Sequence, residues 1–295
     1  MSGTYNDIKL RLQSVTQTRQ MTNAMHLLSA ARMKKTMQSM DYTLDYNDSL
    51  RRLMTDILAE AEDTKLQNIY LERSPKGTAL YLCVMGDKGL CGGYNDDVAQ
   101  LTLAKLRENP AAAVCCFGRI GYDFLRRKGI TPLRVFPGAS MHPEFSLASD
   151  ISWDLLQKYL TDEYNEVFVI YTPFSRKGKL NPVCARLLPL MSSDFTDLGE
   201  DVPDDMIYAP DPTTVFEHIV PIYCAALLYN MLVQASASEN SARMEAMQSA
   251  CDNADAMIDS LSTEMNAVRQ LTITNEITEI AAAAEARKRQ KTIND

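Results

Sequence analysis

Glycine and proline are confined almost entirely to the middle of this 295-residue chain. Of its 12 glycines and 12 prolines, only Gly3 lies outside the segment from Pro75 to Pro221. Glycine ends helices through its backbone entropy, and proline through its missing N–H and the clash of its ring. The two flanking arms consist largely of residues that lose little on entering a helix, such as Ala, Leu, Met, Gln and Glu. The sequence therefore predicts two helical arms, each reaching on the order of 100 Å. Such rods suit a protein that spans, braces or turns another object.

The C-terminal arm carries an apolar seam in which the spacing alternates between three and four residues. This spacing is typical of a left-handed coiled coil rather than of the broader stripe of a surface helix. The seam comprises Met244, Met247, Cys251, Ala254, Ile258, Leu261, Met265 and Val268. A second face continues in a shifted register with Ile273, Ile277, Ile280 and Ala284.

The N-terminal arm has a matching seam, which polar residues interrupt. Its apolar members are Ile8, Leu12 and Val15, followed by Ala30, Met33, Met37, Met40 and Leu44, with Thr16, Gln17, Thr18 and Thr22 between the two runs. Because one arm begins the chain and the other ends it, we expect the two long terminal helices to form an antiparallel coiled coil. The expected domains are residues 1–74 and 206–295 for the two coiled-coil helices and 75–205 for the middle domain.

The middle domain alternates apolar strand-like runs with helical periodicity. Strands are predicted at residues 78–85, 112–117, 166–172 and 183–188, and helices at 97–107, 120–128 and 149–159. This alternation favours a small parallel or mixed sheet with helices on its faces. The fold class is therefore an α/β middle domain inserted between the two terminal helices.

A glycine-rich segment, residues 86–95 (G-D-K-G-L-C-G-G-Y-N), follows the first predicted strand and precedes a helix. Phosphates bind at this position in many α/β folds. The segment matches neither GxGxxG nor GxxxxGK[ST], however, because Lys88 precedes the glycines instead of closing the loop. A tight structural or partner-binding turn is the favoured interpretation.

The composition excludes several classes of function. The net charge of −8 argues against nucleic acid as a general partner. No run of 18 or more apolar residues and no signal sequence is found, so we expect a cytosolic protein or one peripheral to the cytosolic face of a membrane. Seven cysteines without a CxxC pair indicate buried free thiols in a reducing compartment. Three scattered histidines offer little for a metal site, and no set of residues suggests catalysis.

Three segments, taken in order, resemble the γ subunit of the rotary F-type ATP synthase. Residues 8–35 resemble the opening helix of that family, in which a Thr-x-x-(Ile/Met)-Thr-x-Ala-Met core leads to a small-residue and basic run. Residues 89–95 are close to its G-L-C-G-G-(F/Y/L)-N turn, and residues 266–284 are similar to its closing helix. Residues 236–253 also fit, so the resemblance covers essentially the whole chain. Ala283 stands where the family usually has glycine, and the cysteine insert of chloroplast members is absent, which indicates the bacterial type.

The resemblance implies a central rotor shaft. In the family, the two arms lie inside a ring of α and β subunits, while the middle domain joins the ε subunit and the membrane c ring. Rotation of the c ring is transmitted to the catalytic ring and couples ion translocation to ATP synthesis or hydrolysis. The resemblance also implies a non-catalytic subunit that binds no cofactor or metal itself, with ATP or ADP and magnesium on partner subunits. It places the chain on the cytoplasmic face of the bacterial plasma membrane, with no membrane span.

The resemblance assigns partner contacts residue by residue. Met25 is expected to face a lever of the β subunit, and Lys34 and Lys35 to face acidic β residues. Arg269 and Gln270 are expected to catch a β-subunit loop. The glycine-rich turn is expected to lie near the ε subunit and the c ring. Its expected contact residues are Gly89, Leu90, Cys91, Gly92, Gly93 and Asn95.

Two other classes of function remain open from the residues alone. One is a nucleotide-dependent α/β enzyme whose helical arms serve oligomerisation, and the other is a generic coiled-coil adaptor. The enzyme requires a phosphate loop that Lys88 and Gly93 do not supply. The adaptor leaves the three ordered motifs unexplained.

Overall fold

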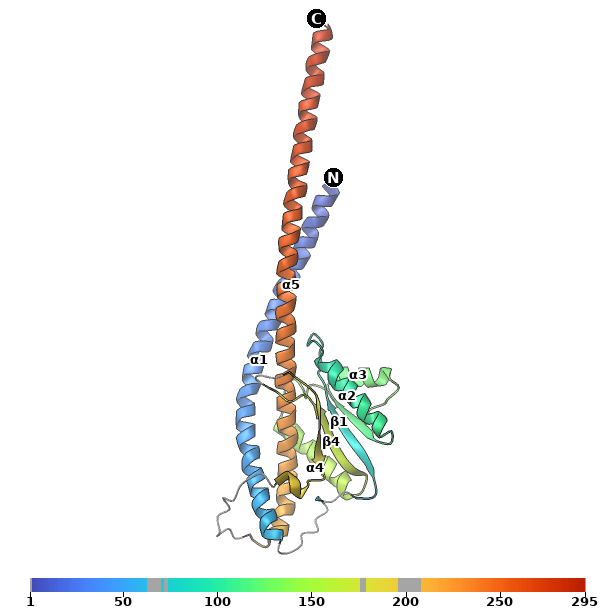
Figure 1. The fold of residues 1–295 in the computed structure, drawn as a ribbon, viewed down its shortest axis with the longest axis vertical. Helices are drawn as coiled ribbons and strands as arrows, with labels where there is room; N and C mark the ends of the chain where they lie inside the picture. Colours follow the sequence, from blue (N-terminus) through green and yellow to red (C-terminus); the bar gives the residue numbers. More distant parts are fainter. Residues whose placement is uncertain (1, 63–69, 72–73, 176–178, 196–207, 295) are drawn as a thin grey trace. The chain divides into compact units, whose positions relative to one another are not determined.

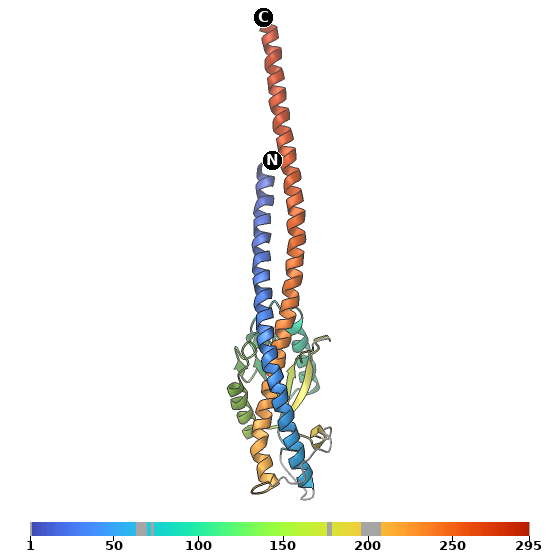
Figure 2. The same cartoon turned by 90° about the vertical axis from the view of Figure 1, so that its left-hand side faces the viewer.

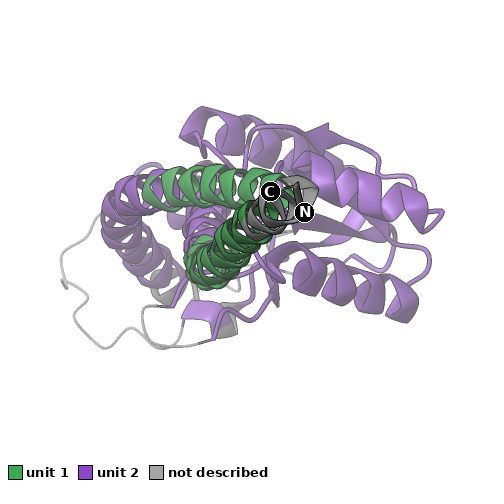
Figure 3. Cartoon of the chain, turned by 90° about the horizontal axis from the view of Figure 1, so that it is seen from above, with its two compact units in different colours: residues 1–27, 246–295 green, residues 28–245 purple. Residues whose placement is uncertain are grey.

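The computed structural model describes residues 2–62, 70–71, 74–175, 179–195 and 208–294 (Figure 1). Two helices dominate it, α1 (Ser2–Glu62) with 61 residues and α5 (Pro212–Asn294) with 83. The chain divides into two compact units, residues 1–27 with 246–295 and residues 28–245 (Figure 3). The boundaries between the two units, after residues 27 and 245, fall inside the long helices. The predicted domain boundaries instead lie at the ends of the two arms. The predicted boundary between residues 205 and 206 lies outside the described residues.

The larger unit, residues 28–245, contains a five-stranded sheet in the order β3-β2-β1-β4-β5. The first four strands in this order run parallel, and β5 pairs antiparallel with β4. The strands are β1 (Thr78–Val84), β2 (Ala113–Phe117), β3 (Val135–Phe136), β4 (Tyr164–Tyr171) and β5 (Val183–Leu188). The connecting elements are α2 (Tyr94–Glu108), α3 (Arg119–Arg127), α4 (Phe145–Leu160) and the short 3-10 helix η1 (Ser192–Phe195).

The sheet is covered on both faces because its side chains alternate along β1. Leu80, Leu82 and Val84 pack in one core with residues of α1, α4 and α5. Tyr81, Cys83 and Met85 pack in a second core with α2 and α3. Right-handed crossovers explain this arrangement. The chain moves from β1 through β2 to β3 with α2 and α3 on one face of the sheet. It then returns past β1 to β4, and this reversed direction places α4 on the other face. Figure 1 shows α2 and α3 on one side of the sheet and α4 and α5 on the other.

The predicted fold class is confirmed, with modest differences in the bounds of elements. All four predicted strands are present, and β5 has the predicted bounds, Val183–Leu188. The helices α2, α3 and α4 each begin one to four residues earlier than their periodicity indicates. The sequence prediction missed β3, because two residues beside β2 are too few to show a strand pattern.

In the smaller unit, the first part of α1 and the last part of α5 form an antiparallel pair (Figure 2). The Thr22 hydroxyl lies 3.1 Å from the Cys251 thiol, and Arg19 forms an ion pair with Asp255 at 3.0 Å. Lower numbers in α1 therefore meet higher numbers in α5, as an antiparallel pair requires. The predicted α5 seam is also confirmed, since Met247, Cys251, Ala254 and Leu261 are buried and its other members are half-buried.

The predicted seam of α1 is wrong in two details. Leu44 is 39% exposed, whereas Thr43 and Asn47 are buried, and Thr22 takes part in the seam instead of interrupting it. The true seam keeps the three–four spacing within each unit but admits polar side chains. Threonine is tolerated there because its hydroxyl bonds to the preceding turn, as Thr43 does to the Ser39 carbonyl at 2.6 Å.

All seven cysteines are free, and six of them are buried. Two thiols nevertheless meet, since Cys83 donates to the sulfur of Cys116 across β1 and β2 at 3.2 Å. This contact and full burial raise the pKa of Cys83 well above its usual range. The pair is therefore a packed element of the second core, in which the Cys83 thiol has little tendency to form the reactive thiolate.

One helix among the described residues is long and apolar enough to cross a membrane. It is α5, where an 18-residue window within Pro212–Ala284 has a mean hydropathy of 1.5. Because 61% of that window is buried against the protein, the pattern is equally that of a core helix.

Candidate functional site

The glycine-rich turn between β1 and α2 is braced from inside by two buried side chains. The Asn95 amide oxygen accepts a hydrogen bond from the Gly86 N–H at 2.8 Å, and its amide nitrogen donates to the Cys91 sulfur at 3.0 Å. Cys91 is 1% exposed and Asn95 8% exposed. These two members of the predicted partner-contact set therefore hold the turn in shape rather than lie at its surface.

The other members of the turn form its surface. Gly89, Leu90, Gly92 and Gly93 are all exposed. Gly92 has a φ of 58°, which glycine adopts freely. Leu90 has a φ of 62°, a conformation that costs an ordinary residue about 1–2 kcal/mol, and its side chain is 63% exposed. A strained backbone that holds an apolar side chain toward solvent is typical of a contact point.

Helix α5 clamps the turn through a buried ion pair. Glu239 accepts from the Arg243 guanidinium at 2.6 Å, and Arg243 also donates to the Lys88 carbonyl at 3.0 Å and more weakly to that of Gly89. Glycine at residue 86 leaves room for this pair, because a Cβ there would lie 2.8 Å from the Glu239 carboxylate and would displace it. Burial raises the pKa of Glu239, and the Arg243 charge opposes this shift.

Asp87 ties the same turn to two further loops. Its carboxylate accepts from the backbone N–H groups of Arg119 and Gly138 at 3.0 and 2.9 Å, and from the Ser140 hydroxyl at 3.3 Å. The turn is thus fixed to α5, to the start of α3 and to the loop before α4.

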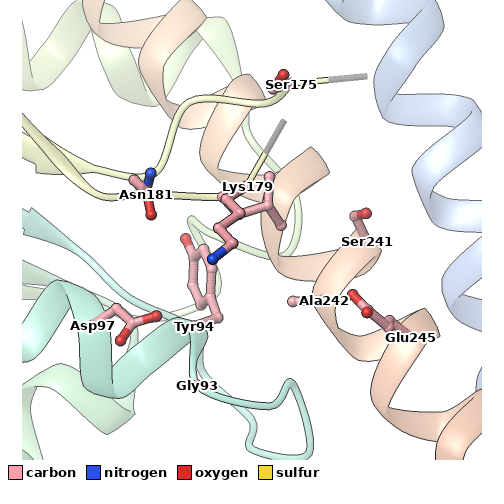
Figure 4. A pocket seen from close by; sticks show the side chains of 10 residues that line it. Gly93, Tyr94, Asp97, Ser175, Lys179, Asn181, Ser241, Ala242 and Glu245 are labelled. Atoms are coloured by element: carbon pink, nitrogen blue, oxygen red, sulfur yellow. The ribbon is translucent and has the colours of Figure 1, made fainter. Parts of the chain in front are cut away.

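A pocket of about 660 Å³ lies beside the turn, at the carboxyl ends of β1 and β4 (Figure 4). The chain leaves these two strands in opposite directions, and ligands bind at such switch points in open α/β sheets. Here Asp97 of α2, Glu245 of α5 and Lys179 line the pocket. In Figure 4 the Lys179 side chain extends toward Tyr94 and Asp97.

The charges of this pocket disfavour a phosphate ligand. A phosphate site at a helix N-terminus uses free N–H groups and a positive local field. At α2 the first turn carries Asp96 and Asp97, and the N–H of Tyr94 is already bonded to the Cys91 carbonyl at 3.3 Å. Glu245 adds a second carboxylate to the lining. Among the described residues, no group of three His, Cys, Asp or Glu side chains is arranged to hold a metal ion.

The remaining predicted contact residues lie on the long helices. Met25 is half-buried on α1, in the smaller unit, one helical turn from the exposed side chain of Met21. Lys34 and Lys35 are both exposed on the part of α1 that belongs to the larger unit. The structure therefore does not gather the predicted residues into one site. It distributes them along the helices and the turn.

Arg269 and Gln270 lie on α5 close to the point where α1 begins. The Thr22–Cys251 and Arg19–Asp255 contacts set a register in which Ser2 is opposite about residue 272. Farther along α5, the apolar side chains lie beyond the part of α1 that the structure describes. Ile273, Ile277 and Ile280 are accordingly 44%, 61% and 70% exposed.

Two features of the site escaped the sequence prediction. The Glu239–Arg243 pair has the i, i+4 spacing of a helical ion pair, which is visible in the sequence. The contact of this pair with a turn about 150 residues earlier in the chain is not visible in the sequence. A groove lined by Tyr42, Tyr46 and Phe145 was missed because these aromatics come from separate segments.

The chain matches the family model described as ATP synthase over residues 4–286. It is 37% identical to the ATP synthase gamma chain of Moorella thermoacetica, over 96% of this chain and 98% of that protein. It is 36% identical to the ATP synthase gamma chain of Caldanaerobacter subterraneus, over 94% and 98% of the two chains.

Solved structures of low sequence identity share the fold. A chain from the Euglena gracilis mitochondrial ATP synthase, in an assembly of OSCP, F1 and c-ring, superposes with a TM-score of 0.66 at 15% identity, covering 99% of this chain and 97% of that one. A chain from the central stalk and c-ring of the Tetrahymena thermophila mitochondrial ATP synthase gives 0.59 at 22% identity, covering 78% and 99%.

Proposed function

The chain belongs to the ATP synthase γ-chain family, and we propose that it acts as the central rotor shaft of an F-type ATP synthase. In this role it transmits rotation of the membrane c ring to the catalytic ring of α and β subunits. Ion translocation is thereby coupled to ATP synthesis or hydrolysis. The observation that carries the proposal is the end of α5, where a single helix with exposed isoleucines continues beyond the start of α1.

The helices supply the asymmetry that such a shaft requires. Arg269 and Gln270 face solvent on one side of α5, and Met25 lies on α1 beside exposed apolar side chains. A β subunit therefore meets a different surface at each rotational position. A partner that contacts one of its own conformations better than another shifts the population toward the favoured one. We infer that Lys34 and Lys35 add contacts with acidic β residues.

The braced turn suits the transfer of torque. The Arg243 clamp and the Asp87 contacts join the turn to α5 and to the sheet domain. We propose that the exposed surface of the turn, with Leu90 at its centre, contacts the ε subunit or the c ring. The chain then works at the cytoplasmic face of the bacterial plasma membrane without spanning it.

We propose that the chain itself is non-catalytic and binds no nucleotide, with ATP, ADP and magnesium bound on partner subunits. The two carboxylates at the switch-point pocket support this. Calorimetry of the free chain with magnesium and ATP is expected to give no saturable heat. A micromolar dissociation constant, about −8 kcal/mol, would return the enzyme alternative to first place.

Reconstitution with purified α and β subunits tests the rotor proposal. The chain is expected to join their ring and to support multi-site ATP hydrolysis, while a bead fixed to its middle domain turns in one direction. A ring that binds the chain and hydrolyses ATP without rotation of the bead would contradict the proposal, as would a failure to assemble.

A further inference from the structure

The switch-point pocket, the cavity of about 660 Å³ at the carboxyl ends of β1 and β4, has no part in the proposed rotor contacts apart from Gly93. Its walls come from α2, from the segment before β5 and from α5. All three walls belong to the larger unit. Pockets that hold small molecules have volumes of roughly 300–1,000 Å³, so this one has the size of a ligand site.

Three charged side chains line the switch-point pocket, one from each wall. Asp97 comes from α2, Lys179 from the segment before β5 and Glu245 from α5. None of these side chains forms an ion pair with another residue that the structure describes. In the view of Figure 4, Lys179 lies between the two carboxylates, with its amine directed toward Tyr94 and Asp97. The lining therefore offers a ligand a negative, a positive and a second negative charge in turn.

The pocket also has an apolar wall with a fixed position. Tyr94 is buried, and its hydroxyl donates to the Ala235 carbonyl at 3.3 Å, which holds the ring in place. Leu180 and Ala242 add apolar surface to the lining. This wall suits the methylene groups of a flexible ligand, which lose contact with water when they lie against it.

Two buried hydroxyls without a hydrogen-bond partner among the described residues border the pocket. Ser238 is 0% exposed and lies on the same face of α5 as Ala242 and Glu245, four and seven residues later. Thr172 is 1% exposed and directly follows β4, three residues before Ser175 of the lining. Buried polar groups without a partner are uncommon in folded proteins and indicate a bound water or ligand. These hydroxyls therefore point independently to a ligand at this edge of the sheet.

We propose that the switch-point pocket binds a free α-amino acid with a basic side chain, such as arginine or lysine. The ligand carboxylate contacts Lys179, its α-ammonium group contacts Asp97, and its side-chain cation contacts Glu245. The methylene groups of the ligand lie against Tyr94 and Ala242. The three charges of the ligand are then the reverse of those in the lining, and together they sum to zero.

Other small ligands leave one of these charges unmatched. A diamine pairs with both carboxylates but brings no anion to Lys179. A neutral or acidic amino acid brings no cation to Glu245. A nucleotide places its phosphate charges beside Asp97 and Glu245, which repel them. A charged group that loses its water on binding without gaining a partner costs affinity, so these ligands are expected to bind more weakly.

Calorimetry of the full chain with L-arginine tests the proposal, which does not depend on the rotor function. Three analogues each lack one charge of L-arginine. Agmatine lacks the carboxylate, N-acetyl-arginine lacks the α-ammonium group and citrulline lacks the side-chain cation. L-arginine is expected to give saturable heat, and each analogue is expected to bind about tenfold more weakly, because it loses one charge-assisted contact.

Three variants assign each contact to its own analogue, as in a double-mutant cycle. Lys179→Gln is expected to remove only the preference over agmatine, Asp97→Asn only that over N-acetyl-arginine, and Glu245→Gln only that over citrulline. The three side chains are exposed, so the variants are expected to fold. The matched control is Asp96→Asn, which changes an exposed carboxylate in the same turn of α2 outside the pocket lining. It is expected to keep the affinity and all three preferences.

The proposal is overturned if L-arginine gives no saturable heat, or if the three preferences persist in all three variants. Binding of agmatine or putrescine that is tighter than binding of L-arginine would identify a polyamine site instead. Each of these results concerns the pocket alone and leaves the rotor proposal in place. Saturable binding of magnesium ATP that L-arginine displaces would contradict both.

Discussion

Single residues decide whether the turn after β1 acts as a rigid contact. Its buried members, Cys91 and Asn95, bond to one another, and Asn95 also accepts from the Gly86 N–H. Arg243 donates to the carbonyls of Lys88 and Gly89. Leu90 is then presented at 63% exposure on a backbone that leucine rarely adopts. The free chain tolerates this strain without a compensating contact among the residues described. This is consistent with the proposed contact of Leu90 with a partner subunit.

Replacing Leu90 by glycine separates the strain from the contact. Leu90→Gly is expected to stabilise the free chain by about 1 kcal/mol, since glycine adopts a φ of 62° at little cost. Urea denaturation gives the change in free energy of unfolding. Leu133→Gly, at an exposed leucine whose φ is not positive, is the control and is expected to give no gain. A less stable Leu90→Gly chain would show that the side chain itself supports the turn.

Glu239 makes stability depend on pH, with a sign opposite to that of most carboxylates. Burial raises its pKa in the folded chain, so the folded state binds the proton more tightly than the unfolded one. Its contribution to stability is therefore greatest below the unfolded pKa of about 4.3 and is lost as the pH rises through the folded pKa. Glu239→Gln is expected to remove this loss while still accepting from Arg243. Melting temperatures of both chains across acidic pH provide the measurement, and parallel profiles would contradict the assignment.

At the scale of the elements, the seam of α1 explains how two helices rich in methionine and alanine hold one register. Polar side chains stand at seam positions, and Arg19 with Asp255 and Thr22 with Cys251 form specific pairs across the smaller unit. An exposed ion pair contributes little stability. Polar groups at seam positions instead disfavour shifted registers, in which they lose their partners.

The register of α1 can be tested with two truncations. Met40 is 7% exposed and Leu44 is 39% exposed. Met40→Ala is expected to destabilise the free chain by about 2–5 kcal/mol, whereas Leu44→Ala is expected to cost about 0.5 kcal/mol or less. Chemical denaturation of the two variants measures the difference. Equal losses would place Leu44 in the seam after all.

The wrong prediction at Leu44 shows that apolar spacing identifies a seam only where the seam residues are apolar. Apolar spacing predicted the α5 seam because nearly all of its members are apolar, and apolar runs predicted the strands for the same reason. In α1, buried threonine and asparagine look like surface residues until the partner helix is known. The turn was visible as a motif, but its clamp depends on Glu239 and Arg243 from a distant segment. Local chemistry can be predicted from the sequence, whereas contacts across the chain need the fold.

At the scale of the whole molecule, the residues that we propose to contact partners lie on separate elements of the chain rather than in one cavity. The turn, the basic part of α1 and the end of α5 are each built on a rigid element. Such a distribution suits a subunit that meets several others at once. A change at one of these places is therefore expected to alter coupling in the complex while the chain stays folded.

The final prediction concerns Arg269 and Gln270, which are exposed beside the buried seam of α5. The guanidinium of Arg269 can donate two hydrogen bonds to a carboxylate or to loop carbonyls, and Gln270 can both donate and accept. In the proposed rotor, contacts of this kind would hold one rotational position until a site fills and would break at the next step. Replacing both residues by alanine is expected to leave folding and assembly intact while multi-site ATP hydrolysis falls several-fold and ion pumping weakens.

The matched control replaces Asp259 and Ser260, also exposed on α5, by alanine. Hydrolysis and pumping are measured in the reconstituted complex, with circular dichroism and subunit composition as checks on folding and assembly. The control is expected to retain both activities, because its side chains lie more than two helical turns from Arg269 and leave the proposed contact in place. If Arg269→Ala with Gln270→Ala keeps full turnover and pumping in an intact complex, these residues do not carry torque. Equal losses in both double variants would instead indicate a general effect on the helix.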